Sequence, residues 1–159
     1  MRSITVITFL VIFLTLMSGS FCIATGEVPA PKQEIKYDYS GPCKELIGMW
    51  TGTLGASQDT RRYDFQHRNV ANWDFNLYVI SVNDRVATGI YCWSAVGKAV
   101  PDCIDLKGTL EPDEDKLVFQ WGEKRVLTIY RTPKVADYRQ VIFQRGEARF
   151  EGLAKKMEK

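Results

Sequence analysis

The sequence predicts an all-β protein, an eight-stranded antiparallel up-and-down barrel. Between residues 46 and 153, short segments of alternating apolar and polar residues follow one another, as in strands with one buried face. Residues that favour turns separate these segments, and about eight strands joined in this way are enough to close a sheet into a small barrel. The face that the alternation turns inward contains no formally charged residue, which agrees with a closed core.

Residues 1–24 are predicted to be a secretory signal peptide. Arg2 precedes an apolar stretch from Ile4 to Met17, and small polar residues follow at 18–20. Cleavage is expected between Cys22 and Gly26. An uncleaved anchor would need roughly 20 apolar residues to cross a bilayer, more than this stretch offers. Lipidation of Cys22 is disfavoured by the bulky phenylalanine directly before it. The protein is therefore expected to be secreted or periplasmic, without stable membrane insertion after cleavage.

Residues 25–44 are expected to form a flexible leader. Pro29, Pro31 and interspersed charges leave this segment without an apolar period, so it can bury little surface. Residues 45–155 are then a single barrel domain, because their number suffices for one hydrophobic core and not for two.

The strands are predicted in the following order. The first begins at Gly48, and a long polar segment, residues 56–72, follows it. The others are expected at residues 75–82, 85–94, 102–111, 116–121, 124–131, 138–144 and 147–153. Tight turns are expected at residues 83–84, 122–123 and 145–146, where Asn, Asp and Gly tolerate positive φ.

The last hairpin shows the inward face most clearly, because Val141, Phe143 and Phe150 share one side and polar residues share the other. The two-residue alternation can be carried back through each turn. It adds the following inward residues: Leu117, Phe119, Trp121, Val126, Thr128, Tyr130, Ile104, Leu106, Tyr91, Trp93, Tyr78 and Ile80. In this register Phe75, Leu77 and Val79 lie on the outer face, where the leader, the long loop or a partner would have to cover them.

Three cysteines remain after signal cleavage. If residues 95–101 connect a symmetric hairpin, Cys92 lies opposite Cys103 at a spacing suited to a disulfide. Cys43 is then left over, either free, joined to another chain, or competing for one of the other two. A metal site is not expected, because the sequence has no Cys-x-x-Cys and a single histidine, His67.

Five of the predicted inward residues are candidate ligand contacts: Tyr78, Tyr91, Trp93, Trp121 and Tyr130. They combine large apolar area with hydroxyl and indole donors, a lining suited to a small apolar or aromatic molecule at the open end of a barrel. The alternative is that these side chains simply fill the interior of a small barrel.

The long polar segment is a candidate interaction loop. Arg61, Arg62, Tyr63 and His67 mix cationic and aromatic groups on a segment too long for a plain turn. Arginines there could bind carboxylate, phosphate or sugar-acid groups, or the loop could contact a protein partner. The alternative is a solvated loop without a partner.

Catalysis and nucleic-acid binding are not expected. Asp64 and His67 lie close together in the long segment, but no motif places a serine or cysteine nucleophile beside them. No catalytic residue and no cofactor is predicted. The net charge of +2 comes without a basic stripe, so nothing favours nucleic acid. A non-catalytic binding protein is the expected class.

Gly48-Met49-Trp50 in the first strand, the long loop after it and the eight-strand meander resemble the calycin group of lipocalin-like secreted carriers. The resemblance covers residues 46–153, although its motif consists of only two residues. It implies an apolar small molecule inside the barrel and a first loop that acts as a lid. The strands are shorter than those of a capacious lipocalin, and no C-terminal helix is evident.

Two fainter resemblances suggest other partners. Thr88–Tyr91 followed by Ser94–Gly97 is similar to the third strand and following loop of avidin-like barrels, which would make Tyr91 and Ser94 polar ligand contacts. The tryptophans of the mature chain do not match the spacing of a biotin pocket. The size and single disulfide also look like small secreted barrels that inhibit hydrolases, the alternative in which the 56–72 loop binds a protein.

Overall fold

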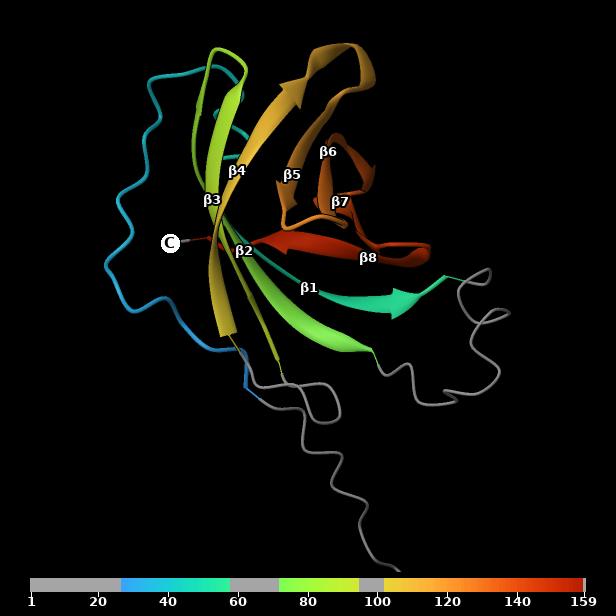
Figure 1. The fold of residues 1–159 in the computed structure, drawn as a ribbon. Coiled ribbons are helices and arrows are strands. Elements are labelled where there is room, and N and C mark those ends of the chain that lie inside the picture. Colours follow the sequence, from blue (N-terminus) through green and yellow to red (C-terminus); the bar gives the residue numbers. More distant parts are fainter. Residues whose placement is uncertain (1–26, 58–71, 95–101, 159) are drawn as a thin grey trace, which may run out of the picture.

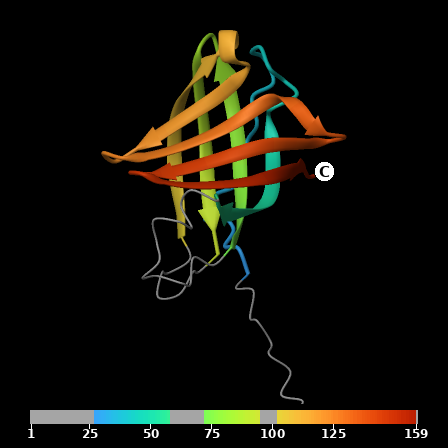
Figure 2. The same cartoon turned by 90° about the vertical axis from the view of Figure 1, so that its right-hand side faces the viewer.

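The computed structural model describes residues 27–57, 72–94 and 102–158. In these ranges eight strands pair in chain order, and the first pairs with the last, so that they form a closed antiparallel barrel (Figure 1). The elements are β1 (Gly48–Ala56), β2 (Trp73–Asn83), β3 (Val86–Trp93), β4 (Asp102–Glu111), the 3-10 turn η1 (Pro112–Glu114), β5 (Lys116–Trp121), β6 (Arg125–Val135), β7 (Tyr138–Arg145) and β8 (Ala148–Lys156). The predicted fold class is confirmed. In Figure 2, β7 and β8 cross the near side of the barrel, with β2 and β3 behind them.

The barrel closes where β1 meets β8, and small residues make this closure possible. Gly52 pairs with Ala154, and Leu54 pairs with Gly152. A Cβ atom on Gly152 would lie 2.0 Å from the carbonyl oxygen of Thr53, and one on Gly52 would lie 2.3 Å from that of Leu153. Both distances are far below van der Waals contact, so a larger residue would push the two strands apart.

Side chains from all eight strands fill the interior. The fully buried ones include Trp50, Leu54, Phe75, Leu77, Val79, Leu117, Phe119, Leu127, Ile129 and Val141. On β4, Ile104 and Leu106 face the core, whereas Asp105 and Lys107 are exposed. This alternation is the predicted one. Burial of this apolar area is the main driving force for folding.

The predicted face of β2 is wrong, and a β-bulge is the reason. Val82 lies inside as expected, but the pairing with β3 shifts by one residue between Val79 and Ser81. The extra residue, Ile80, reverses the side on which every earlier residue of the strand lies. Phe75, Leu77 and Val79 therefore point into the core, whereas Tyr78 lies on the outer face.

The predicted face of β6 is wrong for a related reason. Trp121 pairs with Arg125, so the turn contains three residues, 122–124, and not two. This one-residue difference turns Leu127 and Ile129 inward, and Val126, Thr128 and Tyr130 outward.

The leader runs along the outside of β2 and β3, from the end that carries residues 57 and 72 to the opposite end (Figure 1). The backbone N–H of Asp38 donates to the carbonyl oxygen of Ile80 at 2.9 Å, and Asn83 Nδ2 donates to Asp38 Oδ2 at 3.3 Å. Tyr78, on the outer face beneath this segment, is only 7% exposed. Burial, followed by the nearby hydroxyls of Tyr78 and Tyr39, raises the pKa of Tyr37. The leader thus covers the outer face of β2.

Residues 43–47 close the barrel end at which β1 begins. Leu46 and Ile47 are fully buried, and the N–H of Leu46 donates to the carbonyl oxygen of Cys43. The indole Nε1 of Trp50 donates to the carbonyl oxygen of Leu46 at 2.7 Å. Cys43 is a free, buried cysteine that belongs to the core. Among the described residues, no helix is long and apolar enough to span a membrane.

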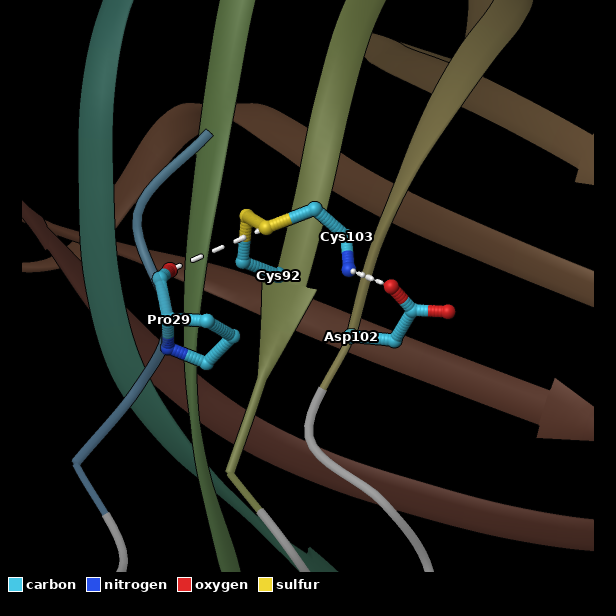
Figure 3. The surroundings of a disulfide bond; sticks show 4 residues. All are labelled: Pro29, Cys92, Asp102 and Cys103. Carbon is cyan, nitrogen blue, oxygen red and sulfur yellow. Dashed lines mark hydrogen bonds between the residues drawn. A yellow bond between two sulfur atoms is a disulfide. The ribbon is translucent and has the colours of Figure 1, made fainter. Parts of the chain in front are cut away.

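The predicted disulfide between Cys92 and Cys103 is present (Figure 3). The two residues are direct cross-strand partners on β3 and β4, with Cα atoms 4.1 Å apart. The sulfur of Cys103 also lies 3.7 Å from the carbonyl oxygen of Pro29, so the leader passes beside the bridge. The disulfide joins two strands at the end of the barrel opposite residues 43–47.

Candidate functional site

Aromatic side chains gather at the barrel end where β1, β3, β5 and β7 finish. We call this group the aromatic end. Its seven members come from five strands: Trp73 and Phe75 (β2), Tyr91 and Trp93 (β3), Trp121 (β5), Phe143 (β7) and Phe150 (β8). Strand alternation and register bring them together, because each is an inward-facing residue near the same rim.

Tyr91 is in contact with four other rings of the group. Its centroid lies 5.5 Å from that of Trp93, 5.8 Å from that of Phe75 and 5.9 Å from that of Trp121. Phe143 is the fourth neighbour, at 6.4 Å. The rings of Tyr91 and Trp93 are close to parallel, at 23°. These distances are those of attractive aromatic pairs.

Phe143 links the rest of the group. Its centroid lies 5.6 Å from that of Trp121 and 5.9 Å from those of Phe150 and Trp73. Trp73 packs edge-on against Phe150, with centroids 4.7 Å apart. Through Phe143 and Tyr91 the seven rings form one continuous aromatic surface, in which both stacked and edge-on pairs occur.

One hydrogen bond orders the polar groups of the aromatic end. The indole Nε1 of Trp73 donates to the hydroxyl oxygen of Tyr91 at 2.9 Å. Tyr91 is 2% exposed, and burial raises the pKa of its hydroxyl, an effect that the bond from Trp73 partly opposes. The hydroxyl is therefore neutral at physiological pH and keeps a fixed position inside the group.

The aromatic end has a buried and a half-buried layer. Phe75 and Tyr91 are buried, whereas Trp73, Trp93, Trp121, Phe143 and Phe150 are half-buried. Farther along the barrel axis, fully buried side chains such as Leu77, Phe119 and Leu127 occupy the interior. The exposed part of this aromatic surface thus lies at the rim, and the middle of the barrel is packed core.

Covalent and hydrogen-bond links hold the strand ends at this rim. Cys92 lies between Tyr91 and Trp93 in the chain, and its bridge to Cys103 fixes β3 to β4 at this level. On the other side of β3, Ser94 N donates to the carbonyl oxygen of Asp74, and Asp74 N donates to Ser94 Oγ. β3 is therefore fixed to both neighbours, which limits how far the rings can separate.

The structure brings three of the five candidate ligand contacts together and leaves two elsewhere. Tyr91, Trp93 and Trp121 belong to the aromatic end. Tyr78 lies on the outer face of β2, and Tyr130 lies on the outer face of β6, where it pairs with Lys116. The candidate loop residues Arg61, Arg62, Tyr63 and His67 lie outside the described residues.

Four members of the aromatic end were not predicted as site residues. Phe143 and Phe150 were assigned to the interior but not to the site. Alternation shows which side of the sheet a residue faces, and not how close it lies to the rim of the barrel. Phe75 was missed because the bulge at Ile80 reversed the face of β2, and Trp73 was missed because β2 begins before the predicted strand at 75–82. The signal that could have found Phe75 is its own alternation with Leu77 and Val79, an apolar set stronger than Tyr78 and Ile80.

Within the described ranges, no group of three or more histidine, cysteine or carboxylate side chains is arranged to hold a metal ion. No family model matches this sequence, and no curated protein matches it either. The fold and the aromatic end are therefore interpreted from their own geometry and chemistry.

Proposed function

We propose that this protein is a secreted, non-catalytic barrel that binds a small apolar or aromatic molecule at its aromatic end. The observation that carries the proposal is the group of five half-buried rings at one rim of a barrel whose middle is packed and whose other end is closed. Half-buried aromatic surface of this extent is costly to leave in water, and a flat apolar ligand would cover it.

The arrangement of the rings favours a flat ligand. Trp93 and Trp121 each lie within 6 Å of Tyr91, so a planar molecule that lies against the exposed parts of these two indoles would meet aromatic surface from both. Each aromatic pair contributes about 0.5–1.5 kcal/mol beyond the area that it buries. Micromolar affinity corresponds to about 8 kcal/mol, so two or three such contacts would supply part of it and apolar burial would have to supply the rest.

The overall architecture supports the same proposal. A closed eight-stranded barrel with Gly48-x-Trp50 in its first strand resembles the lipocalin-like carriers, which bind apolar molecules at the open end. In this chain the packed interior restricts the ligand to the rim. The expected ligand is therefore smaller, or held less deeply, than in a capacious carrier.

The experiment that tests the proposal is a fluorescence titration with 1-aminoanthracene, a flat and neutral probe. We expect saturable binding to the wild type, and at least about a tenfold loss of affinity in Trp93→Ala and in Trp121→Ala, since each removes roughly 1.4 kcal/mol or more of ring contact. Tyr138→Ala is the matched control, because Tyr138 is an exposed aromatic residue on the outer face of β7. Equal affinities in all four proteins would reject the aromatic end as the binding site.

A further inference from the structure

A groove of about 660 Å³ lies at the opposite, closed end of the barrel. Tyr37 and Tyr39 of the leader, Trp50 of β1 and the turn between β6 and β7 contribute to its lining. Arg139 of β7 and Lys156 of β8 complete it. Its volume lies within the range of about 300–1,000 Å³ that is usual for small-molecule sites. No residue of the aromatic end lines it, so the groove is a separate feature of the molecule.

Two cations flank the tryptophan in this groove. The guanidinium carbon of Arg139 and the ammonium nitrogen of Lys156 each lie 5.8 Å from the centroid of the Trp50 ring. Register explains the arrangement: Lys156 pairs with Trp50, and Arg139 pairs with Ala154, so both side chains are directed to the barrel interior at its closed end. Positive charge directed into an apolar barrel end is unusual unless something compensates it.

Among the residues that the structure describes, no carboxylate forms an ion pair with Arg139 or Lys156. Arg139 Nε and Nη1 are buried and have no hydrogen-bond partner. Lys156 Nζ donates to a neutral group, the backbone carbonyl oxygen of Glu45, at 3.0 Å. Burial lowers the pKa of Lys156, the charge of Arg139 lowers it further, and Glu45 acts in the opposite direction. Both cations are thus partly removed from water, and no anion of the described part of the chain is in contact with them.

The acidic groups of the groove do not fill this role. The Glu45 carboxylate is held by Arg131, whose Nε and Nη2 donate to Glu45 Oε1 at 3.0 and 2.9 Å. Asp137 and Glu158 line the groove as exposed residues, and so does Lys155. The acids are therefore solvated at the rim or engaged elsewhere, whereas the two half-buried charges are positive.

Aromatic surface accompanies the charge. The rings of Tyr37 and Tyr39 have centroids 6.2 Å apart and line the groove from the leader, and Tyr39 is 43% exposed. Pro133 of β6 and Ala136 of the turn between β6 and β7 add apolar surface. A ligand that uses every part of the groove needs a flat ring and a negative group.

From this juxtaposition we infer that the closed-end groove is a second binding site, which takes a small aromatic carboxylate. The ring packs against Tyr37 and Tyr39, and the carboxylate is directed to Arg139 and Lys156. Arginine is suited to this role because its planar donors match a carboxylate. An anion here also offsets the cost of two half-buried cations, which a neutral ligand cannot do.

The test is a ¹⁵N chemical-shift titration of the protein with 2-naphthoate and with its neutral isostere 2-naphthamide. Naphthoate is expected to shift the backbone signals of Gly48, Met49, Arg139 and Lys156 in a saturable way. Naphthamide is expected to reach the same shifts only at concentrations at least about tenfold higher. A tenfold ratio of affinities is what the loss of one charge-assisted hydrogen bond would cause. Acetate, which has the charge without the ring, is expected to be weaker than naphthoate by a similar factor.

Two variants assign the preference to its residues. Arg139→Gln keeps part of the side chain, removes the charge, and is expected to reduce the preference for carboxylate over amide severalfold, with the remainder due to Lys156. Arg145→Gln makes the same change at an exposed position of the same strand and is expected to leave the affinity within twofold. If Arg139→Gln does not fold, naphthoate and naphthamide are compared in Lys156→Gln instead. The shifts of the wild-type protein then show whether naphthoate binds in the groove.

Three outcomes would overturn the inference. They are equal affinities for naphthoate and naphthamide at the groove, an unchanged carboxylate preference in the folded Arg139 variant, and shifts confined to the aromatic end, for example at Trp93 and Ser94. The last outcome would leave the proposed function intact while removing the second site. Failure of the aromatic end to bind a neutral probe, in turn, would not affect the groove.

Discussion

Trp73 and Tyr91 form a hydrogen-bonded pair across two neighbouring strands, in which the indole Nε1 donates to the tyrosine hydroxyl at 2.9 Å. The pair fixes the half-buried indole of the aromatic end relative to its buried tyrosine. Because the ring of Trp73 also packs on Phe150, this single bond orders rings from three strands, β2, β3 and β8.

Removing this bond should lower the free energy of unfolding. Trp73→Phe keeps an aromatic ring but leaves the buried Tyr91 hydroxyl without its donor, at an expected cost of about 1–3 kcal/mol. Urea denaturation of Trp73→Phe, Tyr91→Phe and the double variant measures the coupling between the two residues. We expect a coupling energy of about 0.5–1.5 kcal/mol. Strictly additive effects would show that the bond contributes nothing.

The disulfide should stabilise the rim at which the aromatic end lies. Replacing Cys92 and Cys103 together by alanine removes a crosslink with a sequence separation of 11 residues. The expected loss is about 3 kcal/mol in the free energy of unfolding, measured by urea denaturation. Affinity for 1-aminoanthracene should fall as well, since Tyr91 and Trp93 lie on either side of Cys92. An unchanged denaturation midpoint would contradict the structural role of the bridge.

Cys43 should be unreactive in the folded protein. It is 7% exposed, and burial raises the pKa of its thiol, so both access and thiolate fraction are low. In a chain that begins at residue 25, we expect one thiol to react with Ellman's reagent in urea and almost none without urea. Rapid reaction of the native protein would mean that residues 43–47 do not close the barrel end.

The contact between the leader and β2 should weaken in acid. Hydrogen bonds from Ser40, followed by that from Asn83, lower the pKa of the Asp38 carboxyl below its ordinary value of 3.8. A lowered pKa in the folded state means that the stabilisation is present above pH 3.8 and is lost as the pH falls through the folded-state value. NMR signals of the Ser40 amide and the Asn83 side-chain amide should therefore move together in acid. In Asp38→Asn this coupled movement should disappear, and its persistence would assign the transition to another group.

The closure between β1 and β8 should not tolerate a side chain at Gly152. A Cβ atom there would lie 2.0 Å from the carbonyl oxygen of Thr53, so Gly152→Ala requires the strands to move. The expected cost is about 1–3 kcal/mol, typical of overpacking, measured by thermal or urea denaturation. Lys155→Ala, at an exposed position of the same strand, should change stability by less than about 0.5 kcal/mol. Equal effects of the two substitutions would contradict the tight closure.

Alternation and turn residues were sufficient to predict the barrel, the β7–β8 hairpin and the cross-strand disulfide. They failed where one extra residue enters the chain: the bulge at Ile80 and the third turn residue at Lys124 each reverse a strand face. The alternation of Phe75, Leu77 and Val79 indicates the buried face of β2 but not the position of the bulge, and apolar residues on both faces of β6 leave its buried face undecided. The register with the neighbouring strands decides which face is buried.

The sites were predictable to different degrees. Tyr91, Trp93 and Trp121 follow from alternation within single strands. The closed-end groove does not, because it combines residues near 37, 50, 139 and 156, which only barrel closure and the path of the leader bring together. These residues are far apart in the sequence, and the positions of Arg139 and Lys156 relative to Trp50 form no recognisable motif. The sequence alone therefore does not predict the site.

The most direct test of ligand binding at the aromatic end is native mass spectrometry of the protein, purified from its own source, beside its Trp93→Ala variant expressed in the same way. We expect a non-covalent adduct of small mass on the wild type, which is lost on denaturation and strongly reduced in the variant. The same spectrum shows whether residues 1–24 are removed and whether the disulfide is formed. A bare protein at the sequence mass, or an adduct equally abundant in both proteins, would contradict ligand binding at the aromatic end.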